Sequence, residues 1–327
     1  MTEKIKQIFS TREMVYLVAA FAAVYLIWGS TYLGIKYAIE TIPSFIMAAI
    51  RFLAAGAFLY TLGRFSKGYE KPTRAHWKTS FILGAMLLGI GNGGVVVAEH
   101  YLSSSLTALL IATNPFWIVL ISWLFMGKQR PSLMVVLGLL VGFAGVMLLI
   151  VGRGGDGTHE GQWWGILLIM IATLGWAIGS LYGVGAPVAK GLLLSAGMQM
   201  LAGGLILLAM SVVAGEWNTF DLTAVSSTSW LALVYLIVIG AIVAYTAYSW
   251  LMKNASPAAV STYAYVNPAI AVVLGWLIAG ETLTGQMLIG AALILSSVVL
   301  ISKAKKAKQT ADDLDYANEG IHCTASA

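Results

Sequence analysis

The sequence predicts an all-α integral membrane protein with ten transmembrane helices, arranged as two inverted five-helix repeats. Three observations predict this fold class. First, 59% of the 327 residues are hydrophobic and only 10% are charged, whereas soluble proteins carry roughly 25% charged residues. Second, ten apolar runs are long enough to cross a lipid bilayer, which takes about 20 residues. Third, the two halves of the chain repeat the same pattern of residues.

The apolar runs are separated mainly by short polar loops, as expected for a bundle of membrane-spanning helices. The first run is too long for the core of a signal peptide, and no small-residue cleavage site precedes the second run. We therefore interpret it as a retained helix. The ten runs cover residues 14–38, 44–63, 79–99, 104–126, 132–151, 163–185, 192–214, 229–251, 258–279 and 285–302.

An internal repeat relates the fourth run to the ninth. Residues 108–127 and 261–280 both contain Asn-Pro, followed by Trp-Leu and then Gly at the same spacing. A repeat of hydrophobic helices, each interrupted by proline at the same place, is typical of transporters built from two related halves. Because each half has five runs, an odd number, the second half must enter the membrane from the opposite side, so the repeat is inverted.

The distribution of positive charge orients the chain. The chain has 19 Lys and Arg residues. All except Lys36, Arg51 and Arg153 lie in the two terminal segments or at the loops that follow the second, fourth, sixth and eighth runs. The positive-inside rule then places both termini in the cytoplasm. The expected parts are a cytoplasmic N-terminus (1–13), repeat 1 with helices 1–5 (14–151), an extracytoplasmic linker (152–162), repeat 2 with helices 6–10 (163–302) and a disordered cytoplasmic tail (303–327).

The two Asn-Pro pairs predict local breaks in helical hydrogen bonding. A proline inside a helix frees the carbonyl four residues back, which here belongs to Ile111 for Pro115 and to Ala264 for Pro268. In lipid such a carbonyl must face protein or a wet cavity. One interpretation is a structural kink that lets the helices fit together. The other, favoured by the symmetry of the repeat, is a pair of flexible helices that line a substrate path.

Arg51 is the one charge predicted deep inside an apolar run. A buried arginine in hydrocarbon costs at least about 2.5 kcal/mol, so it must find a partner or a water-filled space. Its mate in the repeat, Gln199, is also polar. The functional interpretation is capture of an anionic group of a substrate, such as a carboxylate. The alternative is a structural pair with a backbone carbonyl or with Glu40.

Two acidic positions lie near predicted helix ends. Asn92 and Glu99 share a helical face, and His100 follows, so this carboxylate and imidazole could relay protons. The depth of Glu99 instead favours a charge that headgroup water solvates. Glu281 is interpreted in the same way, as a charge at the end of a helix.

Aromatic residues at mid-span form a further candidate set. Trp28 and Tyr32 share one helical face, as do Tyr263 and Asn267. They are interpreted either as core packing or as the lining of a cavity for an amphipathic solute with an aromatic or cationic part. The candidate substrate-binding residues are Trp28, Tyr32, Arg51, Asn92, Asn114, Trp176, Gln199, Tyr245, Tyr263 and Asn267, with Glu99 and His100 for proton coupling.

Other patterns limit the function. Gly138, Gly142 and Gly145 permit close helix contact, either within the fold or, alternatively, in a homodimer. The sequence has no signature of an enzyme, of a metal site or of nucleotide binding, so we expect no catalytic residue, cofactor, metal or nucleic-acid partner. The single cysteine, Cys323, cannot form an internal disulfide. Because the sequence has no signature of nucleotide binding, uphill transport would draw on a gradient of an ion or a substrate.

Several of these segments together resemble the EamA family of the drug/metabolite transporter superfamily, nearest its YedA-like branch. The resemblance runs from about residue 15 to residue 302. The residues that carry it are 27–32 (IWGSTY), 51–56 (RFLAAG), 91–93 (GNG), 98–100 (AEH), 176–177 (WA) with 179–180 (GS), 263–268 (YAYVNP) and 280–283 (GETL).

This resemblance implies a ten-helix carrier of the inner membrane, with two EamA repeats, a central cavity and peripheral helices 5 and 10. It also implies export of small organic solutes, namely amino acids, related metabolites or drugs. The sequence thus predicts a secondary transporter that works by alternating access, with a small-molecule substrate and membrane lipid as partners. The alternative is an uncoupled channel or a lipid-moving protein that uses the same seam between the repeats.

Overall fold

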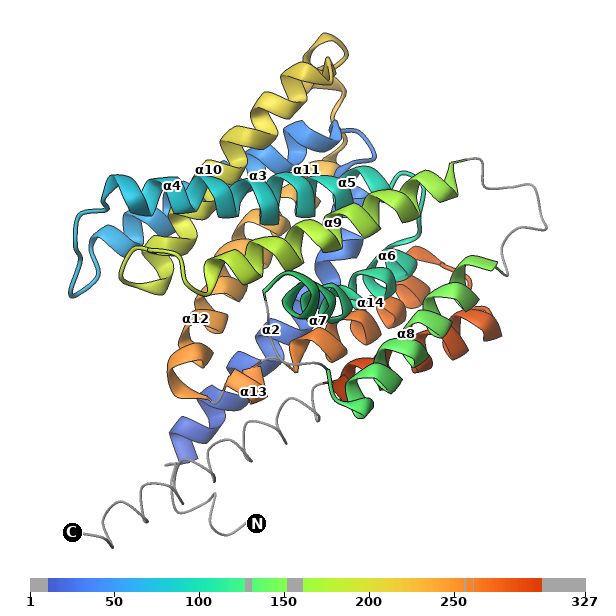
Figure 1. The fold of residues 1–327 in the computed structure, drawn as a ribbon. Coiled ribbons are helices and arrows are strands. Elements are labelled where there is room, and N and C mark those ends of the chain that lie inside the picture. The colour runs from blue at the N-terminus through green and yellow to red at the C-terminus, as the bar shows by residue number, and fades with distance from the viewer. Residues whose placement is uncertain (1–10, 127–130, 152–160, 256, 261, 302–327) are drawn as a thin grey trace, which may run out of the picture. The chain divides into compact units, whose positions relative to one another are not determined.

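A computed structural model describes residues 11–126, 131–151, 161–255, 257–260 and 262–301, and every regular element in these ranges is a helix (Figure 1). Seven helices there are long and apolar enough to cross a membrane, and three further apolar helices, Leu133–Leu149, Val266–Ala279 and Gly285–Ile301, are shorter. These helices fall at the ten predicted runs. The predicted tail lies outside the described residues, as does the predicted linker except for its last two residues.

The helices begin and end close to the predicted bounds. The third run starts earlier than predicted, at Arg74, because Thr73 and His76 form a reciprocal capping box ahead of the apolar residues. The labelled elements are α2 (Thr11–Ala38), α3 (Ser44–Arg64), α4 (Arg74–Leu83), η1 (Gly84–Asn92), α5 (Gly93–Ala98), α6 (Ser104–Ile111), α7 (Asn114–Phe125), α8 (Leu133–Val151), α9 (Gln162–Gly183), α10 (Leu192–Val213), η2 (Glu216–Asn218), η3 (Leu222–Ala224), α11 (Ser227–Tyr235), η4 (Leu236–Val243), α12 (Ala244–Asn254), α13 (Pro257–Val260) and α14 (Tyr263–Ala279).

The contacts divide the chain into two compact units that do not follow the two halves of the sequence. The first unit comprises the described parts of Met1–Ile118 and Asp156–Leu283, and the second those of Val119–Gly155 and Thr284–Ala327. Each unit therefore contains segments from both halves. The second unit holds α8 and the helix Gly285–Ile301, which are the fifth and tenth predicted helices.

Glycines let α3 and α10 approach closely in the first unit. A Cβ atom added to Gly63 would lie 2.7 Å from the Cα of Leu194, and one added to Gly197 would meet the backbone of Tyr60. Glycine is required at such positions because any larger residue would force the two backbones apart. This contact joins a helix of the first half to its repeat mate in the second.

Two stretches of wide, π-helical turns occur in equivalent helices of the two halves. The segment η1 lies between α4 and α5, with which it forms one continuous helix, and η4 lies between α11 and α12 (Figure 1). Such turns are rare in proteins and are frequent at functional sites. Both segments contribute residues to the cavity described below.

In the second unit α8 packs closely against the helix Gly285–Ile301. A Cβ atom added to Gly138 would lie 2.9 Å from the side chain of Ile301, and one added to Gly145 would lie 2.9 Å from that of Leu293. The amide of Gln286 donates to the carbonyl of Leu148. The predicted small-residue stripe thus contributes at least Gly138 and Gly145 to packing within the fold.

Candidate functional site

A cavity of about 400 Å³ lies within the first unit, a size suited to a small organic molecule. Its walls come from both halves of the sequence and include the two π-helical segments. It is lined by Trp28, Thr31, Tyr32, Ile35, Arg51, Phe52, Leu88, Asn92, Val95, Ile111, Ala112, Asn114, Pro115, Trp176, Ser180, Met200, Gly240, Ala241, Tyr245, Tyr263, Ala264, Asn267 and Pro268.

The structure brings all but one of the ten candidate substrate-binding residues to this cavity. The exception is Gln199, whose side chain donates to the hydroxyl of Ser195 in its own helix at 3.1 Å and does not line the cavity. Glu99 and His100 also lie outside the lining. Whether the lining residues bind a substrate stays a prediction.

Arg51 lines the cavity without an ionic partner. The residue is 6% exposed, its Nε atom has no hydrogen-bond partner, and neither of the ion pairs found among the described residues includes it. Its guanidinium lies 5.0 Å from the centre of the neighbouring Phe52 ring. The alternative interpretation, a pair with Glu40, is not what the structure shows, since Glu40 is exposed and forms neither of these ion pairs.

The amide side chains of the lining differ in how well they are paired. Asn92 donates to the carbonyl of Leu87 at 3.2 Å, and the indole of Trp176 donates to the same carbonyl at 2.7 Å. With its nitrogen placed to satisfy its surroundings, the amide of Asn267 donates to the backbone carbonyls of Tyr25 and Tyr263. The Oδ1 atom of Asn114, by contrast, is buried without a partner. The unpaired Oδ1 atom of Asn114 and the guanidinium of Arg51, which has no ionic partner, therefore belong to the same cavity lining.

Aromatic rings form one wall of the cavity. Trp28 of α2 meets Tyr263 of α14 edge to face, with ring centres 5.1 Å apart, and lies 5.2 Å from Tyr248 of α12. Tyr245 lies one turn before Tyr248, with ring centres 5.7 Å apart. Such a cluster offers apolar contact together with ring faces that attract cations.

The two prolines occupy different local structures. The fourth predicted helix is interrupted between Ile111, where α6 ends, and Asn114, where α7 begins, so Pro115 stands directly after the break. Pro268 lies inside α14, which continues through it. Ile111 and Ala264, the residues whose carbonyls the prolines were predicted to free, both line the cavity.

Glutamate residues gather where helix ends of both halves meet, a region that we call the acidic end. Glu216, after α10, accepts hydrogen bonds from the backbone amides of Phe45 and Ile46 at the start of α3, at 3.0 and 2.9 Å. Glu281, after α14, binds the start of α6. Both carboxylates thus satisfy amide groups that a helix start leaves without partners, where negative charge is also favoured.

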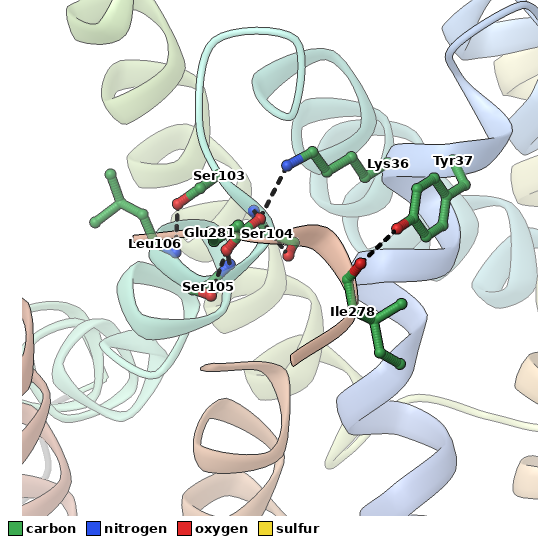
Figure 2. A network of polar contacts seen from close by, with 8 residues as sticks. All are labelled: Lys36, Tyr37, Ser103, Ser104, Ser105, Leu106, Ile278 and Glu281. Carbon is green, nitrogen blue, oxygen red and sulfur yellow. Dashed lines mark hydrogen bonds and ion pairs between the residues drawn. The ribbon is translucent and has the colours of Figure 1, made fainter. Parts of the chain in front are cut away.

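Figure 2 shows the network around Glu281. Its carboxylate accepts from the backbone amides of Ser104 and Ser105 at 2.9 and 3.1 Å, from both of their hydroxyls, and from the ammonium of Lys36 at 3.0 Å. Burial raises the pKa of Glu281, but the hydrogen bonds from Ser105, Lys36 and Ser104 outweigh it and lower this pKa to about 2. The network joins α2, α6 and the segment after α14.

Glu281 is therefore a charge at a helix end, as interpreted, but not one that headgroup water solvates. The residue does follow α14, but its side chain is only 6% exposed because α6 and Lys36 cover it. The sequence offered one signal, the pair of serines that begins the fourth apolar run, although it could not show which carboxylate they would bind.

Glu99 is also buried, which corrects the expectation that headgroup water solvates it. It follows α5, is 5% exposed, and neither of its carboxyl oxygens has a hydrogen-bond partner. The neighbouring His100 is exposed as a residue, and its Nε2 atom lies 2.7 Å from the hydroxyl of the buried Ser44. Burial lowers the pKa of His100, while Glu216 opposes this shift.

Comparison with known proteins identifies the family. The EamA-like transporter family matches residues 14–151 and again residues 163–303. The chain belongs to this family. It is 39% identical over 296 residues to the inner membrane transporter YedA of Escherichia coli (strain K12), covering 90% of this chain and 93% of YedA. The expected likeness to the YedA-like branch is thereby confirmed.

Other relatives are more distant. The transporter YvbV of Bacillus subtilis (strain 168) is 27% identical, with 94% of this chain and 96% of YvbV covered. A chloroplastic WAT1-related protein of Arabidopsis thaliana is also 27% identical, over 80% of this chain and 63% of its own. One solved crystal structure shares the fold with a TM-score of 0.59 at 20% identity, covering 87% of this chain and 95% of that one. The protein is accordingly a multi-pass transporter of the inner membrane.

Several residues that line the cavity of this protein were not predicted. Thr31, Phe52, Leu88, Gly240 and Ala241 line it alongside the predicted set. These are apolar or small residues in apolar helices, and nothing in the sequence separates them from residues that only pack. Gly240 lies beside Arg51, since an added Cβ would lie 3.7 Å from the guanidinium and 3.2 Å from the side chain of Thr31.

Proposed function

We propose that this protein exports small organic solutes, such as amino acids, related metabolites or drugs, by alternating access through the cavity. Membership of the EamA-like family supports transport. The two family matches support an architecture of two repeats. The five apolar runs in each half support ten membrane spans, and the distribution of positive charge supports cytoplasmic termini. The substrate class rests on the chemistry of the lining.

The observation that carries the proposal is the unpaired cation of Arg51 at the cavity. A buried charge without a counter-ion is costly, and no carboxylate lies within 4 Å of this guanidinium among the described residues. A carboxylate brought in by a solute would supply the missing charge through two parallel hydrogen bonds. Arg51 thus favours substrates that carry a carboxylate.

The rest of the lining suits the other parts of an amino acid. The unpaired Oδ1 atom of Asn114 can accept a hydrogen bond from an ammonium group. The ring faces around Trp28 and Tyr263 offer contact to a cation or to an apolar side chain. A volume of about 400 Å³ accommodates one such molecule.

Alternating access requires the cavity to open to each side in turn. The closed network of Glu281, Ser104 and Lys36 supports a gate at the acidic end, because it joins segments from both halves of the sequence. The break before Pro115 supplies a flexible joint beside the cavity.

The test is counterflow of labelled L-phenylalanine, L-leucine and L-threonine in proteoliposomes that contain the purified protein. Arg51→Gln should abolish saturable counterflow, and Arg51→Lys should restore part of it because the charge remains. The matched control is Arg64→Gln, which removes an exposed arginine from the same helix.

Unchanged counterflow in Arg51→Gln would remove this residue from the mechanism. Flux of amino acids that does not saturate and shows no counterflow would instead indicate the uncoupled channel. Movement of labelled lipid without any amino-acid flux would indicate a lipid-moving protein.

A further inference from the structure

The acidic end contains three glutamates with different surroundings. Glu216 and Glu281 each accept hydrogen bonds from two backbone amides at the start of a helix. Glu99 is more deeply buried than either of them, at 5% exposed, yet both of its oxygens lack a partner. Structural capping therefore explains the first two carboxylates and leaves the third without a structural role.

An ionised carboxylate without partners is costly in a buried site, and the usual response is to take up a proton. Burial, together with the nearby charge of Glu281, raises the pKa of Glu99 well above its ordinary value, although Lys36 and Arg51 oppose the shift. In this conformation the surroundings of Glu99 therefore favour its neutral form over its ionised form. Loss of its proton requires a change in hydration or the approach of a cation.

The surroundings of Glu99 show which cation is free to respond. Among the described residues, the ionisable groups found to interact with it are Tyr32 and Lys36 of α2, Arg51 of α3 and Glu281 after α14, and His100 adjoins it in the chain. Lys36 is already bound to Glu281 at 3.0 Å. His100 is engaged with the hydroxyl of Ser44.

Arg51 is the remaining cation, and it too lacks an ionic partner. It lines the cavity together with Val95, which stands one helical turn before Glu99. Glu99 and Arg51 influence each other electrostatically but lie more than 4 Å apart, since no ion pair forms between them. Glu99 and the Nε atom of Arg51 are thus both buried without a hydrogen-bond partner, and the two groups are near enough to influence each other electrostatically.

We propose that Glu99 is a proton-binding site of the transport cycle, whose protonation frees Arg51 to bind the carboxylate of a substrate. This rests on the proposed function. When Glu99 is neutral, Arg51 has no internal counter-ion and attracts the solute. When the proton leaves, the Glu99 carboxylate becomes a competing counter-ion for Arg51, and affinity for the solute falls. Binding of a carboxylate likewise raises proton affinity at Glu99, because the two sites are reciprocally linked.

The direction of coupling follows from this linkage. Proton and substrate bind together, so they cross the membrane together, and an outward gradient of substrate carries protons out with it. The affinity for L-phenylalanine should weaken by up to about tenfold per pH unit above the pKa of Glu99.

The experiment uses the full-length protein in proteoliposomes loaded with L-phenylalanine and a pH-sensitive dye. Wild-type protein should raise the internal pH as L-phenylalanine leaves. Glu99→Gln, which mimics the protonated form, should keep L-phenylalanine counterflow, move no protons and bind with an affinity independent of pH. The control is Glu40→Gln, which makes the same change at an exposed site after α2 and should behave as wild type.

Infrared difference spectra between pH 5 and pH 9 test Glu99 without any substrate. Wild type and Glu40→Gln should show the stretching band of a buried protonated carboxyl group, and Glu99→Gln should lack it. The inference would be overturned if Glu99→Gln moved as many protons as wild type, or if this variant kept the carboxyl stretching band. Absence of counterflow in all proteins would count against the proposed function, whereas the infrared result decides protonation of Glu99 separately.

Discussion

Replacement of Glu281 by alanine should destabilise the protein by about 3 kcal/mol. The substitution removes the acceptor for two backbone amides at the start of α6, for the hydroxyls of Ser104 and Ser105, and for Lys36. Loss of a helix-capping acceptor costs about 0.5–2 kcal/mol, and breaking a buried ion pair from one side costs about 3–5 kcal/mol. Because the Lys36 side chain is 32% exposed, water compensates part of the loss from the ion pair, which lowers the expected total to about 3 kcal/mol, below the simple sum of the two ranges.

The assay is unfolding of the purified protein by SDS in mixed micelles, followed by tryptophan fluorescence. Glu281→Gln keeps an acceptor oxygen of the same reach and should cost about half as much as Glu281→Ala. Lys36→Met, measured alone and together with Glu281→Ala, separates the ion pair from the capping bonds. Glu40→Ala is the control, because it removes an exposed glutamate near the same end of α2.

A loss below about 1 kcal/mol for Glu281→Ala, or one equal to that of Glu40→Ala, would refute the reasoning. It would mean that solvent or a neighbouring group replaces the carboxylate at the start of α6. The gate assigned to this network would then lack an energetic basis.

Three further outcomes are expected. The pKa of Glu281 is lowered to about 2 from 4.5, so the stabilisation that its carboxylate provides is complete above pH 4.5 and is lost as the pH falls toward 2. In SDS titrations, wild type should therefore lose about 1–2 kcal/mol of stability between pH 7 and pH 3. Glu281→Gln should show no such loss. Gly197→Ala should cost about 1–3 kcal/mol because its Cβ meets the backbone of α3, and Gly185→Ala, which has open space around it, should cost far less in the same titration. Gly240→Leu should reduce L-phenylalanine counterflow by about tenfold, because the added side chain extends beside Arg51. The variant should still unfold cooperatively. Undiminished counterflow would show that the substrate avoids this region.

The candidate cavity was predictable to a large degree from polar and aromatic residues at mid-span. In a membrane protein such residues have few places to lie other than the interior between helices, which is why Trp28, Asn92 and Tyr245 reach one cavity. Gln199 shows where this reasoning fails. Its position in the repeat predicted a role like that of Arg51, but a serine one turn earlier satisfies its amide within its own helix.

The positions of the helices follow from the sequence alone, because apolar length fixes which segments can cross a bilayer. The distribution of positive charge predicts their orientation. The fate of the acidic residues at helix ends was decided only by the tertiary structure. Glu99 and Glu281 both stand just beyond apolar helices, where the sequence indicates contact with water. Ends of other helices cover them instead, binding Glu281 and leaving Glu99 without a partner. The solvation of a charge depends on which segments, distant in sequence, come to lie over it, and a linear pattern does not contain that information.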